Sequence, residues 1–82
     1  MSDVSVLERD DELVVRLVSD DWTVGDAALA AADIGDRFHA SPASAVALET
    51  RPLEELSEAG LYFVKTVEIL VELGGGTFSL EG

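Results

Sequence analysis

A length of 82 residues is the strongest constraint on this chain, because it suffices for only one hydrophobic core. Two separate cores would each bury too little apolar surface to offset the chain entropy that folding removes. Apolar residues make up 48% of the sequence and are spread along its whole length. We therefore expect residues 1–82 to form a single folded domain and not a disordered acidic segment.

Short apolar runs alternate with helical patterns along the sequence. β-Branched or alternating runs predict strands, and the polar cluster 9–12 between the first two predicts a hairpin turn. Capping oxygens followed by small residues predict one helix, and an amphipathic repeat from Ser57 predicts another. The expected strands cover about 4–8, 13–18, 45–50 and 77–80, and the expected helices cover about 24–38 and 57–72.

This β-β-α-β-α-β order predicts an α/β fold with a small mixed four-stranded sheet. The first two strands form an antiparallel hairpin, whereas strands that follow a helix pair in parallel. Right-handed crossovers then place both helices mainly on one face of the sheet. We expect Leu61 and Val64 to hold the second helix to the sheet. The stripe expected to do so in the first helix is Val24, Ala28, Ala31, Gly35 and Phe38.

The chain is strongly acidic, with 17 acidic residues against five basic ones and a formal charge of −12. Such a surface repels phosphate backbones and anionic membranes, so we expect no nucleic-acid partner. The acidity has two interpretations, adaptation to a salt-rich, halophilic cytoplasm or complementarity to a basic partner. The acidic residues are scattered along the sequence, which favours the first.

The residue types present also limit the chemistry of the chain. There is no cysteine, and His39 is the single histidine, so we expect no disulfide, bound metal or cofactor. The glycine run 74–76 follows a predicted helix instead of opening one, so it is not a phosphate-binding loop. No serine, histidine and aspartate occur in a catalytic context, and we expect no catalytic residues. The amino terminus lacks a signal-peptide pattern and no apolar run reaches membrane-spanning length, so we expect a cytoplasmic protein without direct membrane insertion.

Five segments together resemble the STAS domain, a family named for sulphate transporters and anti-sigma-factor antagonists. They are 17–24 (LVSDDWTV), 45–49 (AVALE), 57–61 (SEAGL), 72–76 (ELGGG) and 77–82 (TFSLEG). The third segment occupies the place of the family signature, which reads Asp-Ser, a small residue, then Gly-Leu. The chain is similar to a compact STAS domain without the usual C-terminal helix, and the resemblance implies the same α/β fold.

The signature also implies a regulatory role. In anti-sigma-factor antagonists a partner kinase phosphorylates the second signature residue, a serine. Glu58 occupies that position here and carries about one negative charge, against nearly two for phosphoserine. Ser57 and Thr50 are weaker alternative phosphoacceptors, and we favour a helix N-cap for Ser57 and a solvated loop residue for Thr50.

The resemblance therefore implies a non-catalytic protein-interaction module that docks a kinase, sensor or assembly subunit near the start of the helix at Ser57. Trp22 either anchors a partner or packs at the edge of the core, and we favour packing. An alternative is a structural subunit or homo-oligomer of a larger, transport-associated assembly, whose open sheet edge or missing terminal helix is completed by another copy. The expected partner-binding residues are Ser57, Glu58, Ala59, Gly60, Thr50 and Trp22.

Overall fold

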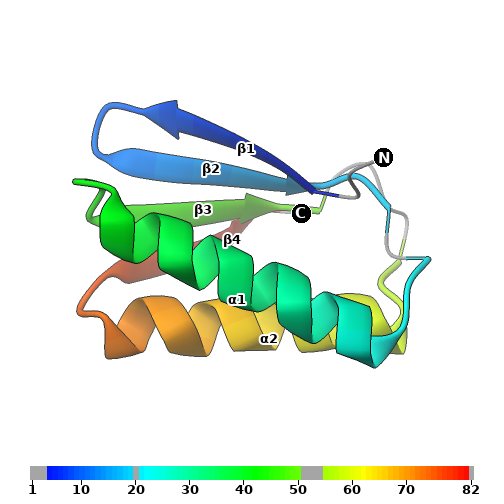
Figure 1. Ribbon diagram of the computed structural model, residues 1–82. Coiled ribbons are helices and arrows are strands. Elements are labelled where there is room, and N and C mark those ends of the chain that lie inside the picture. Colours follow the sequence, from blue (N-terminus) through cyan, green and yellow to red (C-terminus); the bar gives the residue numbers. More distant parts are fainter. Residues whose placement is uncertain (1–3, 20, 51–54, 82) are drawn as a thin grey trace.

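The computed structural model describes residues 4–19, 21–50 and 55–81 and confirms the predicted α/β fold. Four strands and two helices follow one another in the expected order (Figure 1). Both helices lie on the same side of the sheet (Figure 1). The elements are β1 (Val4–Arg9), β2 (Glu12–Leu17), α1 (Val24–Ala40), β3 (Ala45–Glu49), α2 (Glu58–Leu73) and β4 (Thr77–Glu81).

The sheet has the order β1-β2-β3-β4, so each strand pairs with its neighbour in the sequence. β1 and β2 are antiparallel, whereas β3 and β4 each pair in parallel with the preceding strand. The two-residue turn between β1 and β2 contains Asp10 at φ 57°, a left-handed conformation that aspartate tolerates better than most residues. In register, Val46 lies between Leu13 and Phe78, which aligns the apolar side chains on the helix-covered face.

Helix α1 begins at a threonine cap and ends before a proline. The Thr23 hydroxyl accepts a hydrogen bond from the Asp26 N–H at 3.1 Å, and Pro42 disfavours a further turn. The predicted stripe was partly wrong, because Val24 is 39% exposed and Ala28 only half-buried. A run of alanines offers no contrast in size that would locate the inner face. The buried residues are Ala27, Ala31, Ile34, Gly35 and Phe38.

Helix α2 faces both the sheet and α1. The prediction for Val64 is confirmed, but the prediction for Leu61 is wrong, since Leu61 is 52% exposed. Leu70 lies so close to Gly35 of α1 that a Cβ there would stand 3.0 Å from the Leu70 Cδ1 atom. Leu61 and Leu70 are nine positions apart, which places them on opposite sides of the helix, so Leu61 points away from α1. The buried residues are Ala59, Gly60, Phe63, Val64, Val67 and Val71.

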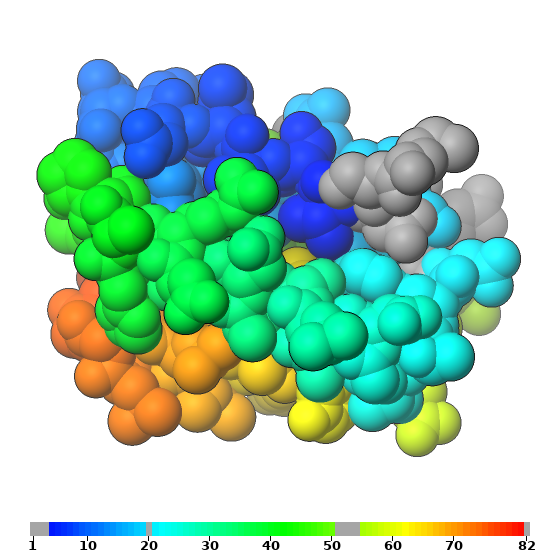
Figure 2. Space-filling model, viewed as in Figure 1, coloured from blue at the N-terminus to red at the C-terminus, as the bar shows by residue number. Residues whose placement is uncertain are grey.

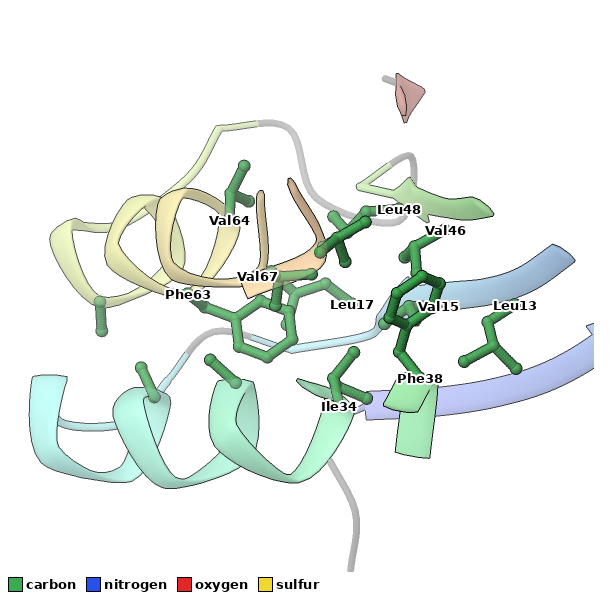
Figure 3. Close-up of a cluster of buried hydrophobic side chains, with 14 residues drawn as sticks. Leu13, Val15, Leu17, Ile34, Phe38, Val46, Leu48, Phe63, Val64 and Val67 are labelled. Carbon is green, nitrogen blue, oxygen red and sulfur yellow. The ribbon is translucent and has the colours of Figure 1, made fainter. Parts of the chain in front are cut away.

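The core fills the space between the sheet and the two helices (Figure 3). Figure 3 shows Phe63 and Ile34 pointing from the helices toward the side chains of the strands. No described helix covers the opposite, open face of the sheet (Figure 1), which carries the exposed Leu7 beside the buried Val14 and Ala47. On that face an ion pair joins Arg16 and Glu49 at 3.4 Å. The strands contribute Leu13, Val15, Leu17, Val46 and Leu48 to the core.

Salt is expected to stabilise this domain. In the ion pairs of Arg9, Arg16, Arg37 and Lys65 the basic side chain is mostly exposed, and the net charge of −12 leaves most carboxylates to repel one another. Ions screen such repulsion beyond about 10 Å at 0.1 M. A relief of about 1 kcal/mol would raise the Tm by about 4–8 °C, and we expect a rise of this size between about 0.02 and 1 M chloride. Thermal melts across that series test it, and a constant Tm would exclude the high-salt interpretation of the composition.

Candidate functional site

The carboxyl ends of β2 and β3 lie at the same end of the domain as the first turns of α1 and α2 (Figure 1). This arrangement follows from parallel strands connected by helices, and open α/β sheets commonly bind ligands outside the carboxyl ends of their strands. Three of the predicted site segments belong to this end of the domain. They are Trp22, Thr50 and the start of α2 at Ser57.

Ser57 caps α2. Its backbone is extended, and its hydroxyl accepts a hydrogen bond from the Gly60 N–H at 3.1 Å. The predicted N-cap is therefore confirmed. Because the oxygen that would accept a phosphate already serves the helix start, modification there would perturb the cap itself.

The next five residues divide between the core and the surface. Ala59 and Gly60 are buried, so their side of the helix faces the core and they are not available to touch a partner directly. Glu58 and Leu61 are exposed, and Tyr62 is 44% exposed. Spacings of three and four residues place these three side chains on one outer face of the first two turns.

Leu61 and Tyr62 were absent from the residues predicted to bind a partner. The spacing from Glu58 indicated that Leu61 and Tyr62 share its side of the helix. The sequence left open whether Tyr62 or the adjacent Phe63 faced inward. The structure assigns the inward position to Phe63, which is fully buried, and the outward one to Tyr62. The surface formed by Glu58, Leu61 and Tyr62 is called the α2-start surface below.

Trp22 packs at the edge of the core, as favoured from the sequence. Its ring centroid lies 5.4 Å from that of Phe63, at a tilt of 44°. The indole Nε1–H is buried and has no hydrogen-bond partner among the described residues. Beside it a cavity of about 140 Å³ lies between β1 and α1, the elements that meet across the front of Figure 2. Trp22, which precedes the cap of α1, thus packs against the second turn of α2.

Thr50 is held more firmly than the predicted loop residue would be. Its N–H donates a hydrogen bond to the Glu81 carbonyl at 2.9 Å, which continues the pairing of β3 with β4 by one residue. Thr50 is half-buried at the carboxyl end of β3. Its position at the end of a strand agrees with the prediction. The prediction of a solvated loop residue does not, because Thr50 is half-buried and its backbone is hydrogen-bonded to β4.

Carboxylates surround both helix starts. Asp21 and Asp26 flank the cap of α1, and Glu55 and Glu58 flank the cap of α2. Negative charge is favourable at the positive end of a helix dipole, so these acids stabilise the two helices. They also give this end of the domain a negative potential. A ligand that binds here is expected to carry positive charge on the contacting surface.

The remaining chemistry of the described residues is limited. In ranges 4–19, 21–50 and 55–81 no group of three or more histidine, aspartate or glutamate side chains could hold a metal ion. His39 lies in the last turn of α1, against Phe38 at 5.9 Å between ring centroids, and thus at the opposite end of the helix from the cap. The helices described here are too short or too polar to cross a membrane.

A scan of the sequence against models of known protein families finds no match, and a search of curated proteins finds no relative.

Proposed function

We propose that this domain is a non-catalytic regulatory module, similar to a STAS domain, that binds a protein partner through the α2-start surface. The observation that supports it best is the exposure of Leu61 and Tyr62 next to Glu58. Large apolar side chains surrounded by charge are typical of protein interfaces, and tyrosine is enriched among the residues that dominate binding energy.

The chemistry of this surface specifies the partner. Leu61 and Tyr62 require an apolar recess with an acceptor or donor for the phenol group. Glu58 requires a basic side chain at the rim, and a charge in that position acts mainly on the association rate and its salt dependence. The proposed partner is therefore a protein with a small apolar pocket bordered by lysine or arginine.

The resemblance to the STAS signature suggests how binding is regulated. A phosphoserine would switch this surface between two partners, whereas Glu58 carries its charge permanently. We infer that the module is always in the charged state, and that control of binding lies with the partner or with the amount of this protein. The kinase, sensor or assembly subunit implied by the family remains the proposed class of partner.

Substitutions of Glu58 test this function. Once a partner has been isolated by affinity purification, Glu58→Lys is expected to weaken its binding about tenfold, or about 1.4 kcal/mol, at 0.15 M salt. Glu58→Ser is expected to have a smaller effect of the same sign. Glu58→Ser should cost the fold no more than the helix-dipole contribution of about 0.3–1 kcal/mol, and Glu58→Lys no more than about twice that, because Glu58 is exposed.

Asp36→Lys is a matched control, since it makes the same charge change at an exposed position just before the last turn of α1. It should bind like the parent. Affinity by calorimetry and Tm are measured for all four proteins at one salt concentration. If Glu58→Lys and Glu58→Ser bind as tightly as the parent, the α2-start surface is not the interface.

A further inference from the structure

The outer face of α2 carries a second apolar feature that extends along most of the helix. Ile69 is 56% exposed and Leu73 80% exposed, and both lie on the side of Tyr62. Thr66 is half-buried and lies in the same row, between Tyr62 and Ile69. A single exposed leucine is ordinary on a protein surface. A row of large apolar residues on so acidic a protein indicates an interaction surface. We call Tyr62, Thr66, Ile69 and Leu73 the outer seam.

The spacing within the outer seam identifies what covers it. Steps of four, three and four residues are those of the a and d positions of a coiled coil, where one helix packs along another. From Tyr62 to Leu73 the seam is about 16 Å long, or three turns. The complementary surface is therefore a helix with a similar row of apolar residues.

We propose that the outer seam pairs with the same seam of a second copy of this chain, with the two α2 helices antiparallel about a two-fold axis. A two-fold interface brings one patch against itself, and this seam is complementary to itself in that orientation. Tyr62 would lie opposite Leu73 of the second copy, and Thr66 opposite Ile69 of the second copy. Each pair across the interface then contains at least one large apolar side chain.

The charges beside the seam favour the same pairing. Lys65 is the only lysine of the chain, and its side chain is 77% exposed on the flank that also carries Glu72. Within its own helix it pairs with Glu68 only at 3.8 Å. In the antiparallel arrangement each Lys65 approaches Glu72 of the second copy, which gives two equivalent ion pairs. A parallel arrangement would instead turn the flank of Lys65 toward the opposite flank of the second helix, away from Glu72.

The expected association is weak and increases with salt. A seam of three turns falls at the small end of specific interfaces, and two copies together carry twice −12, or −24 charges. Screening that repulsion favours the dimer. Because Tyr62 belongs to both the outer seam and the α2-start surface, a bound partner and a second copy would compete.

Sedimentation equilibrium of the full chain tests the proposal without any partner. At about 1 M chloride the mass should rise from 8.7 kDa toward twice that value as the concentration increases to about 1 mM. Ile69→Glu and Leu73→Glu should each lower the association constant at least tenfold. Leu7→Glu is the control, since Leu7 is 59% exposed on the open face of the sheet and should dimerise like the parent.

Charge exchange tests the antiparallel register at about 0.15 M salt, where ion pairs are less screened. Lys65→Glu should weaken association several-fold, and the double exchange of Lys65→Glu with Glu72→Lys should restore it while keeping the parent net charge. A protein that stays monomeric at every concentration and salt overturns the proposal. So does a dimer that Ile69→Glu leaves intact, or a double exchange that fails to restore association.

Discussion

Replacing Phe63 with alanine is expected to lower the free energy of unfolding by about 3–5 kcal/mol. The Phe63 side chain is fully buried in the core, into which it points from α2 (Figure 3). It also supports Trp22 at a centroid distance of 5.4 Å. Removing the ring would leave a cavity and would remove the aromatic contact with Trp22, and both effects destabilise the domain.

Urea denaturation at molar salt measures this loss, and Leu61→Ala is the matched control on the same helix. Leu61 is 52% exposed, so its truncation should cost less than about 0.5 kcal/mol. The difference between the two variants tests the rotation of α2 about its axis. Equal losses, or a larger loss for Leu61→Ala, would mean that the helix presents a different face to the sheet.

Replacing Gly76 with alanine is expected to cost about 1–3 kcal/mol through overpacking. Gly76 lies between α2 and β4, and a Cβ there would collide with the Phe38 ring and stand 3.1 Å from the Val71 Cγ1 atom. Phe38 is buried, so its ring has little space into which it can move.

Gly75→Ala separates this collision from backbone strain. Gly75 has φ 82° and no atom within 4 Å of an added Cβ, so its substitution should cost about 1–2 kcal/mol from the left-handed conformation alone. In a Phe38→Leu background the Gly76→Ala penalty should shrink, whereas the Gly75→Ala penalty should not change. A double-mutant cycle by urea denaturation measures both differences. Additive losses for Phe38→Leu and Gly76→Ala would show that the ring is not what excludes the side chain.

The order of the elements was predictable because its signals are local. The polar cluster 9–12, the pair Ser41-Pro42 and the glycine run 74–76 each interrupt an apolar segment and mark a boundary. Progressive right-handed crossovers then allow few arrangements of four strands and two helices. The resulting sheet order and the placement of both helices on one face follow from rules that do not depend on individual side chains.

The rotation of each helix about its axis was less predictable. Leu61 falls beside the apolar stripe of α2, and only the contact of Leu70 with Gly35 shows which flank α1 occupies. In α1 the alanines are equally suited to burial and exposure. They do not indicate which side of the helix faces inward, and Val24 was therefore wrongly predicted to be buried. Packing between two helices is a non-local property, and the periodicity of one helix does not contain it.

The candidate site divides in the same way. The cap at Ser57 has a local cause and was predicted, as was the packing of Trp22 at the core edge. The burial of Ala59 and Gly60 and the exposure of Tyr62 depend on helix rotation. The surface available to a partner therefore differs from the predicted one within the first two turns of α2, where Leu61 and Tyr62 take the place of Ala59 and Gly60.

Site-specific photocrosslinking in the cells that make this protein tests the central claim most directly. A photoreactive side chain is placed at Glu58 or Leu61 on the α2-start surface, and at Leu7 on the open face of the sheet as a control with comparable exposure. We expect one protein partner, of mass different from this chain, to be trapped at positions 58 and 61 and not at position 7. Adducts at position 7 in the absence of adducts at 58 and 61 would contradict the proposed binding surface.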